Sequence, residues 1–340
     1  MMRRRGGGLL LVAVILMVCG IAGAEGQKTI TVSATGADFT TIQAAVNAAP
    51  EEGAVIKIRP GVYREVVHVD KPKIQMRGDT DDWTKVVLVY GNSAASTCGT
   101  RCSATLFVTG NDFFAGNMTI ANDYSKTSDV PSQAVALSLR ADRAVVRHVR
   151  LLGAQDTLYA SSMGCMQGAL PGTDCVTGRQ YYSDCYIEGH VDFIFGDAKA
   201  VFENCEIRSI AHAAGGYLTA QSNTRPGQDA GYVFNHCKIT ADKGAGDVYL
   251  GRPWRDYSTV IFMNTDIEAP IMAAGWSEWK DAPQPRLPTA TYAEFNSTGP
   301  GANPMAREPL SKQLTAAEAK KYETKAHLAG ADRWDPTAVK

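Results

Sequence analysis

A short strand-like pattern recurs along the chain and constrains the fold more than any other feature. Each copy has an apolar pair, a polar spacer and an alternating tripeptide that ends in Ile or Leu. The copies are FFAGNMTI (113–120), VVRHVRLL (145–152), YYSDCYI (181–187), VFENCEI (201–207), VFNHCKI (233–239) and IFMNTDI (261–267). The closing residues stand at positions 120, 151, 187, 207, 239 and 267, so the copies are 31, 36, 20, 32 and 28 residues apart. Repeats of this size built from short strands are typical of a solenoid.

The pattern predicts an all-β fold, a parallel β-helix. No helical period separates the copies, which argues against alternating βαβ units. The chain also has 32 glycines, and its short runs of Val, Thr, Tyr and Phe favour strands separated by tight turns. We expect each coil to bury stacked Ile, Val and Phe side chains, with loops of variable length projecting from one side.

The two ends of the solenoid are predicted to differ. An amphipathic helix is expected over 38–50, with Thr40 or Thr41 as its N-cap and an apolar stripe from Ile42 to Ala49. It would cover the open N-terminal end, where strand edges are otherwise unpaired. A second helix is expected over 316–324. The segment 280–310 is rich in Pro, Gly and Asn and is predicted to be a long surface loop.

The first residues have the organisation of a secretory signal peptide. Basic residues 3–5 precede an apolar run over 9–21, and residues 22–24 form a small-x-small cleavage pattern. We expect cleavage after Ala24, which leaves 25–340 as one exported catalytic domain, either extracellular or periplasmic. The alternative is a membrane anchor, but the run is short for a span. The formal net charge of −1 argues against nucleic-acid binding. We expect a monomer without membrane or nucleic-acid partners.

Export makes disulfides the expected state of the cysteines. The sequence has no pair of histidines at zinc-ligand spacing. The plausible local pairs are Cys98–Cys102, Cys165–Cys175 and Cys185–Cys205. Cys237 is then left over and is expected to be a buried core thiol.

Four stretches carry polar groups that a core does not explain. They are SQAVALSL (132–139), GAQDTLYA (153–160), HVDFIFGD (190–197) and YLGRPWRDY (249–257). A carboxylate inside an apolar run, as at Asp192, is costly unless something pairs with it or uses it. In a β-helix, successive coils stack about 4.8 Å apart, so distant positions can line one groove. We expect Gln133, Gln155, Asp156, Asp192 and Arg252 to converge there.

These four stretches together resemble the signature segments of the pectin methylesterases, also called pectinesterases. GVYREVV (61–67) and EFNSTGPGA (294–302) fit the same family, and the resemblance covers about residues 28 to 330. It implies a right-handed parallel β-helix that hydrolyses the methyl esters of polygalacturonate in pectin. It also implies that no metal or cofactor is required, and that the partner is methyl-esterified homogalacturonan.

The resemblance also assigns roles to individual residues. Asp192 matches the nucleophile, Asp156 the acid/base, and Arg252 the arginine that orients the nucleophile and keeps it ionised. Gln133 and Gln155 match the side chains that stabilise the oxyanion. The substrate contacts that it implies are those of Gln133, Arg252, Trp254, Thr100 and Phe195.

The connection between the two aspartates departs from part of the family. It includes the segment 161–180, and plant members have a shorter connection. The segment is predicted to form a loop, clasped by Cys165–Cys175, that walls the groove and affects the choice of substrate pattern. With the absence of a long inhibitory pro-region, it favours a bacterial-type member.

The residues suit ester chemistry. A desolvated carboxylate can attack an ester carbonyl, and two amide donors can stabilise the resulting oxyanion, one donor typically contributing about 2.7–4 kcal/mol. Methoxide needs a proton to leave, and a second carboxyl group with a raised pKa can supply it. A polygalacturonase would instead need carboxylates spaced for water attack at a glycosidic bond, and a pectate lyase a calcium-binding cluster. A solenoid that only binds carbohydrate, or an esterase for another ester, is a further alternative.

Each feature also has a purely structural interpretation. Asp192 and Arg252 alone would fit a buried ion pair, and the two glutamines alone would fit an amide ladder. The tyrosines Tyr159 and Tyr217 are predicted to pack against neighbours. Trp276 and Trp279 are predicted to lie in the core or at the rim. It is the four stretches in combination that favour the enzymatic interpretation.

Overall fold

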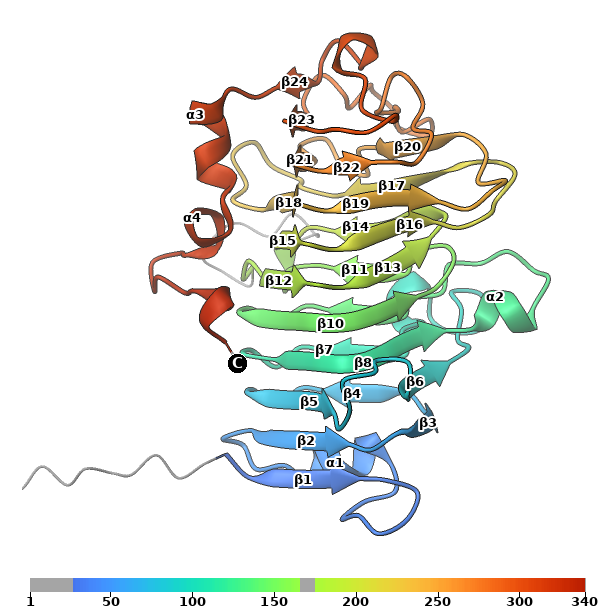
Figure 1. Cartoon of the computed structure of the whole chain (residues 1–340), viewed down its shortest axis with the longest axis vertical. Coiled ribbons are helices and arrows are strands. Elements are labelled where there is room, and N and C mark those ends of the chain that lie inside the picture. Colours follow the sequence, from blue (N-terminus) through green and yellow to red (C-terminus); the bar gives the residue numbers. More distant parts are fainter. Residues whose placement is uncertain (1–26, 166–174, 340) are drawn as a thin grey trace, which may run out of the picture.

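The chain winds into a stack of coils along one long axis, as the computed structural model shows for residues 27–165 and 175–339 (Figure 1). The closing residues of the repeats lie directly above one another. Parallel pairing aligns Ile120 with Leu151, Leu151 with Ile187, and then Ile207, Ile239 and Ile267 in turn. All of these side chains are fully buried. The predicted parallel β-helix is confirmed, and the repeat in the sequence is the repeat of its coils.

Most strands belong to a large sheet that covers two faces of the β-helix. Its strands in the described residues are β1 (Thr29–Val32), β2 (Ala54–Ile58), β3 (Gly61–Arg64), β5 (Ile74–Gly78), β6 (Val86–Tyr90), β8 (Phe114–Asn122), β10 (Ala144–Leu152), β12 (Arg179–Ser183), β13 (Tyr186–Gly189), β15 (Lys199–Glu203), β16 (Glu206–Ser209), β18 (Gly231–Asn235), β19 (Lys238–Ala241), β21 (Thr259–Met263), β22 (Asp266–Ile267), β23 (Thr291–Phe295) and β24 (Lys312–Gln313). The long strands β8 and β10 run across both faces and join them.

A smaller parallel sheet forms the remaining face. It consists of β4 (Val67–Val69), β7 (Leu106–Val108), β9 (Leu137–Leu139), β11 (Leu158–Ala160), β14 (Val191–Gly196), β17 (Gly216–Gln221) and β20 (Val248–Gly251). The polar stretches singled out in the sequence lie on this sheet or directly beside its strands.

The polar spacer of each repeat forms a corner of the coil. The spacer residues all have φ between 49° and 56°: Asn117, His148, Asp184, Asn204, His236 and Asn264. Few residues with a side chain adopt this left-handed conformation, and Asn, Asp and His are enriched among those that do. The spacer is therefore polar because the corner requires these residue types.

Aligned aromatic rings fill the core beneath the corners. Tyr182 stacks on Phe202, Phe202 on Phe234, and Phe234 on Phe262, with ring centroids 4.5–4.6 Å apart. All four side chains are fully buried. Burying one such side chain contributes about 1.5–3 kcal/mol, so the stack adds substantially to the stability of successive coils.

The N-terminal end of the stack is covered by a helix, as predicted. Helix α1 (Ile42–Ala48) is shorter than the predicted range, and Thr41 is its N-cap, with its hydroxyl accepting from the N–H of Ala44. Its buried residues Ile42, Ala45 and Val46 belong to the main core (Figure 1).

The C-terminal segment returns along the side of the β-helix (Figure 1). It contains α3 (Ala316–Ala319) and α4 (Thr324–Leu328), and the predicted helix over 316–324 is therefore interrupted. Side chains of this segment, among them Tyr322 and Leu328, pack on residues of the large sheet such as Val201 and Val233. Most of 280–310 is loop, with β23 inserted.

The cysteine pairing differs from the prediction at one pair. The predicted bridges Cys98–Cys102 and Cys165–Cys175 are present. The predicted bridge between Cys185 and Cys205 is wrong, because both are free and buried, as is Cys237. The three thiols occupy equivalent places in successive coils, and each donates to a backbone carbonyl of the preceding coil, at 3.3–3.5 Å: those of Val146, Tyr182 and Phe202. Each cysteine acts as a small, weakly donating core residue.

Candidate active site

Backbone hydrogen bonds between successive coils bring the polar stretches together. Ala134 donates its N–H to the carbonyl of Gln155, and Asp156 donates to the carbonyl of Val191, both at 3.1 Å. On the far side of β17, Arg252 donates to the carbonyl of Thr219 at 3.0 Å. Each bond joins residues 21 to 35 positions apart, and together these bonds align the polar stretches across the smaller sheet.

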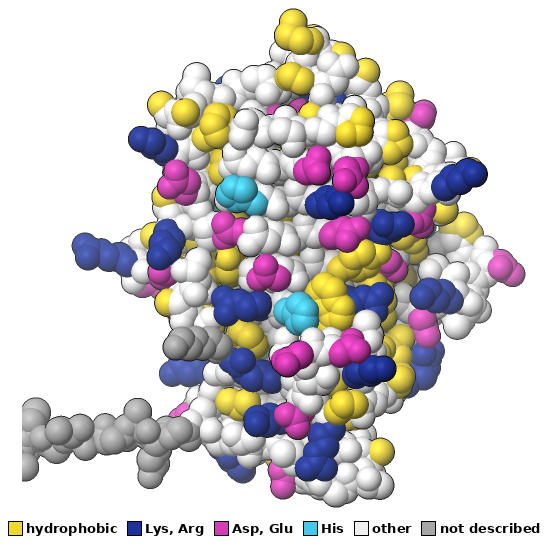
Figure 2. Space-filling model, viewed as in Figure 1, with side chains coloured by type: hydrophobic (Ala, Val, Ile, Leu, Met, Phe, Trp, Pro, Cys, Tyr) yellow, Lys and Arg dark blue, Asp and Glu magenta, His cyan; other side chains and the backbone are white. Residues whose placement is uncertain are grey.

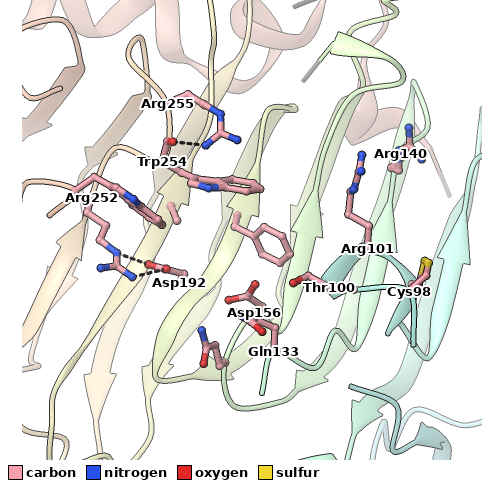
Figure 3. Close-up of a pocket in the computed structure, with 16 residues that line it drawn as sticks. Cys98, Thr100, Arg101, Gln133, Arg140, Asp156, Asp192, Arg252, Trp254 and Arg255 are labelled. Carbon is pink, nitrogen blue, oxygen red and sulfur yellow. Dashed lines mark hydrogen bonds and ion pairs between the residues drawn. A yellow bond between two sulfur atoms is a disulfide. The ribbon is translucent and has the colours of Figure 1, made fainter. Parts of the chain in front are cut away.

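A pocket of about 750 Å³ opens over these coils (Figure 3). All eight site residues predicted from the sequence line it: Thr100, Gln133, Gln155, Asp156, Asp192, Phe195, Arg252 and Trp254. Its volume lies within the range of ligand pockets in proteins and is large for a methyl ester group alone. The pocket therefore has room for several groups of a larger ligand.

Asp192 lies at an irregularity of strand β14. The register between β14 and β17 shifts between Val191 and Ile194, and Asp192 has a φ of 51°. A β-bulge of this kind bends the strand and redirects a side chain. This explains how a carboxylate in an apolar run reaches the pocket while the flanking Phe193 and Ile194 remain in the core.

Arg252 holds the carboxylate of Asp192 by two hydrogen bonds. Its Nε donates to Oδ1 at 2.9 Å and its Nη2 to Oδ2 at 2.7 Å. The side chains of Arg252 and Asp192 are only 18% and 9% exposed. Burial raises the pKa of Asp192, while the hydrogen bond and the charge of Arg252 oppose that rise and favour the ionised form.

Two aromatic rings sandwich the guanidinium group of Arg252. Its central carbon lies 3.9 Å from the ring centroid of Tyr217 and 4.3 Å from that of Trp279. Such cation–π contacts restrict the side chain and stabilise its charge. Tyr217 and Trp279 therefore position Arg252, a role that the sequence analysis did not assign to them.

Asp156 is the second buried carboxyl group of the pocket. It is 8% exposed, and within the described residues its carboxyl group makes no hydrogen bond and no ion pair. Burial raises its pKa well above the usual range, the negative charge of Asp192 raises it further, and Arg252 opposes both effects. Of the two carboxyl groups, Asp156 is therefore the one whose protonated form the pocket favours, whereas Asp192 is paired with a cation.

Amide donors and apolar surface complete the pocket. Neither Gln133 nor Gln155 uses its side-chain amide in a hydrogen bond within the part of the chain that is described, so both amides are free to donate to a ligand. Phe195 is 3% exposed and stacks on Tyr159 with ring centroids 4.8 Å apart. The ring of Trp254 meets Phe195 edge-on. The pocket thus joins charged and amide groups to an aromatic wall.

The sequence analysis missed several residues that line the pocket. Arg101, Arg140 and Arg255 lie along it (Figure 3). Trp279 lines it as well, which agrees with its predicted place in the core or at the rim. Trp276, by contrast, is 2% exposed and stacks on Tyr292 in the core, as predicted. The available signal was the position of Arg101 next to Thr100, of Arg140 directly after the stretch 132–139, and of Arg255 inside the stretch 249–257.

Two further predictions concern segments near the pocket and the chain as a whole. The described residues of 161–180 do not line the pocket, and 166–174 lie outside the described residues, so the predicted wall stays a prediction. The predicted signal peptide, residues 1–24, also lies outside them. Over 27–165 and 175–339, no helix has the length and apolar character needed to cross a membrane. The same residues hold no group of three His, Cys, Asp or Glu side chains arranged to bind a metal ion.

Comparisons with known proteins identify the family of the chain. The family model described as pectinesterase matches residues 29–331. The chain belongs to the pectinesterase family. Pectinesterase 31 of Arabidopsis thaliana is 35% identical over 308 residues, which cover 86% of this chain and 89% of the relative.

Solved pectinesterase structures share the fold as well. The pectin methylesterase from carrot superposes with a TM-score of 0.81 at 31% identity, covering 92% of this chain and 96% of its own. A pectin methylesterase in complex with a hexasaccharide superposes with a TM-score of 0.75 at 28% identity, covering 91% and 98%. These comparisons do not separate bacterial from plant types, so the bacterial type stays a prediction.

Proposed function

We propose that this pectinesterase hydrolyses the methyl esters of polygalacturonate in pectin and releases methanol. The observation that carries the proposal is a pair of buried carboxyl groups in one pocket, of which Asp192 is paired with Arg252 and Asp156 is not. Family membership and the names of the relatives support the same reaction. The individual roles of the residues are part of the proposal.

In the first half-reaction, a carboxylate oxygen of Asp192 attacks the ester carbonyl carbon. The carbonyl π electrons move to oxygen, and the amides of Gln133 and Gln155 donate hydrogen bonds to that oxyanion. Collapse of the intermediate breaks the bond to the methoxy oxygen, which takes the proton of Asp156 and leaves as methanol. The product is an anhydride between Asp192 and the sugar carboxyl group.

In the second half-reaction, water opens the anhydride. Asp156, now ionised, removes a proton from the water as its oxygen attacks the sugar acyl carbon. Asp192 leaves as a carboxylate, again held by Arg252, and Asp156 is protonated once more. The mechanism starts with Asp156 protonated and Asp192 ionised. The raised pKa of Asp156 favours the first of these states, and the arginine partner of Asp192 favours the second.

The substrate contacts and the location of the protein follow from the same proposal. Thr100, Phe195 and Trp254 contact the polysaccharide, and so do Gln133 and Arg252. We propose that residues 1–24 direct export and are removed, that the domain begins at residue 25, and that the protein acts as a secreted monomer. The hexasaccharide bound to a related methylesterase supports a polymeric substrate for the groove.

The test is methanol release from highly esterified pectin, measured with and without EDTA. We expect methanol without new reducing ends or unsaturated products, at a rate that EDTA does not change. New reducing ends would indicate a polygalacturonase, and unsaturated products with EDTA inhibition would indicate a pectate lyase. Failure to release methanol from any pectin would refute the proposed function.

The roles of the aspartates are tested by isosteric substitutions. Asp192→Asn and Asp156→Asn should each lower kcat by about 10³-fold or more, because each half-reaction needs a carboxyl group at both places. Asp197→Asn is a matched control. Asp197 is fully buried close to β14, and its Oδ1 accepts from Ser161 and Ser162, as an asparagine oxygen can. Substantial activity in Asp192→Asn would remove Asp192 as the nucleophile.

A further inference from the structure

Two charged side chains near the pocket are used differently from those on the open surface. Acidic and basic side chains are interspersed over the face shown in Figure 2, and some pair with each other beside the large sheet, as Arg208 does with Asp242 at 2.6 Å. Glu278 and Arg286, in contrast, bind backbone groups of the loops that carry pocket residues. Their contacts suggest a role in holding those loops.

Two loops lie next to each other beside the pocket. The first, 252–258, connects β20 to β21 and carries Arg252 and Trp254, and the second, 277–290, precedes β23 and carries Trp279. Both loops are described in full, and no backbone hydrogen bond joins one to the other. The strand ladder therefore does not set their relative position, and side-chain contacts have to do so.

Arg286 of the second loop binds the backbone of the first. Its Nη1 donates to the carbonyl of Trp254 at 2.7 Å and to that of Pro253 at 3.4 Å. Its Nε donates to Oδ1 of Asp256 at 3.0 Å, and the side chain of Arg286 is only 13% exposed. The Trp254 carbonyl also accepts from Arg255 at 2.8 Å (Figure 3). Hydrogen bonds from charged donors are stronger than neutral ones, so Arg286 fixes the backbone position of Trp254.

The carboxylate of Glu278 closes the second loop on itself. Its Oε1 accepts from the N–H groups of Trp279 at 3.0 Å and Arg286 at 2.9 Å. Its Oε2 accepts from the N–H of Leu287 at 3.1 Å. One side chain thus binds both ends of the segment between Trp279 and Leu287. Because the ring of Trp279 packs on the guanidinium group of Arg252, this anchor supports the residue that holds Asp192.

We propose that Glu278 and Arg286 are positioning residues that hold the rings of Trp279 and Trp254 at the pocket. This inference rests on the proposed function, in which Trp254 contacts the polysaccharide and Arg252 holds the nucleophile. Neither Glu278 nor Arg286 lines the pocket, so neither acts on the substrate directly. Arg286 acts on substrate binding through Trp254. Glu278 acts on the chemical step through Trp279, which restrains Arg252.

The test measures kcat and KM separately, from methanol release on highly esterified pectin. Arg286→Gln should raise KM about tenfold and change kcat little, because it removes charged hydrogen bonds that place a substrate-binding ring. Glu278→Ala should chiefly lower kcat, also about tenfold, because it frees the loop whose ring restrains Arg252. Thermal unfolding of each variant shows that the assay temperature lies below its transition.

Double-mutant cycles identify the path of each effect. A residue that acts only through a second residue has no further effect once that second residue is replaced. Arg286→Gln should therefore leave KM unchanged in a Trp254→Leu background. Glu278→Ala should likewise leave kcat unchanged in a Trp279→Leu background. A general loss of stability would instead lower activity by the same factor in both backgrounds.

Conservative variants and a matched control complete the test. Arg286→Lys can still donate to the Trp254 carbonyl, and Glu278→Gln keeps an oxygen that can accept from Trp279, so each should recover part of the loss. These two variants also test the inference if the larger changes prevent folding. Asp256→Asn is the control, because Asp256 is 61% exposed and an asparagine oxygen can still accept from Arg286. It should leave kcat and KM unchanged.

The outcomes separate this inference from the proposed function. Wild-type kcat and KM in Arg286→Gln and Glu278→Ala would overturn the positioning roles and leave the esterase activity standing. Additive effects in either cycle would overturn the role that this cycle tests, because the residue would then act independently of its tryptophan. Absence of methanol release by the wild type would refute the esterase function itself.

Discussion

Replacing Arg252 with methionine tests the electrostatic basis of the proposed mechanism. Methionine keeps an apolar stem between the rings of Tyr217 and Trp279 but removes both hydrogen bonds to Asp192. Asp192 would then be a buried carboxyl group without a partner. The burial that raises its pKa would be unopposed, so its protonated form would be favoured further.

The size of the effect follows from the cost of breaking a buried ion pair. Removing one partner of such a pair costs about 3–5 kcal/mol, and one pKa unit corresponds to about 1.36 kcal/mol. Since the side chain of Arg252 is 18% exposed, we take the lower end, a rise of about two units in the pKa of Asp192. The nucleophile must be ionised, so the acid limb of the kcat/KM profile should move about two units to higher pH. Arg252 also lowers the pKa of Asp156, so the basic limb should move in the same direction.

The assay is methanol release as a function of pH, with thermal unfolding measured at each pH. Arg252→Lys keeps the positive charge and should shift the limbs less. Arg208→Met is a matched control, because Arg208 pairs with Asp242 in a surface ion pair whose side chains are 34% and 32% exposed. That substitution should cost about 0–1 kcal/mol and leave the profile in place. A loss of activity in Arg252→Met with both limbs unmoved would refute the reasoning.

Three further predictions concern stability and the thiols. Asp156→Asn should be more stable than the wild type above about pH 4, and the difference should grow as pH rises. The reason is that the pKa of Asp156 is raised in the folded protein, so the unfolded chain ionises this carboxyl group more readily and gains stability relative to the fold. Thermal melts across pH measure this difference. Phe234→Ala should lower the free energy of unfolding in urea by about 3–5 kcal/mol, whereas Val62→Ala, at an exposed position, should change it by about 0.5 kcal/mol or less. In protein lacking residues 1–24, a thiol reagent should label no cysteine in the native state. After unfolding without reductant it should label three, those at positions 185, 205 and 237. Labelling of a single cysteine after unfolding would show that the Cys185–Cys205 bridge is present after all.

The sequence predicts the strands of the large sheet much better than those of the smaller sheet, which forms the third face of each coil. The repeat identifies the strands of the large sheet because each copy combines a buried closing residue, such as Ile207, with a polar corner, such as Asn204. Strands β4, β7, β9 and β11 have only three residues each, too few for a period to show. The return of the C-terminal segment along the large sheet depends on distant contacts, such as that of Arg147 with the Val339 carbonyl, which no local pattern encodes.

The same distinction applies to the site. Asp192 was selected because a charge in an apolar run needs a reason, and Asp156 because it belongs to one of the four stretches whose polar groups a core does not explain. Arg101 and Arg255 were missed because they lie in loops, and the pairing of strands does not fix the path of a loop. The failed Cys185–Cys205 pairing has a related cause. Spacing shows that two cysteines come close, but the direction of each thiol depends on the packing inside the coil.

The two aspartates of the site interrupt the regular ladder that supports them. Asp156 and Asp192 have φ values of 64° and 51°, and Asp192 also lies at the bulge of β14. Placing a residue with a side chain in the left-handed conformation costs about 1–3 kcal/mol, and the hydrogen bonds of the coils on both sides offset this cost. Aspartate and asparagine tolerate this conformation better than most residues. Asp192→Asn therefore removes only the nucleophilic charge, whereas Asp192→Ala would add backbone strain, and a loss of activity in the alanine variant alone would not identify the nucleophile.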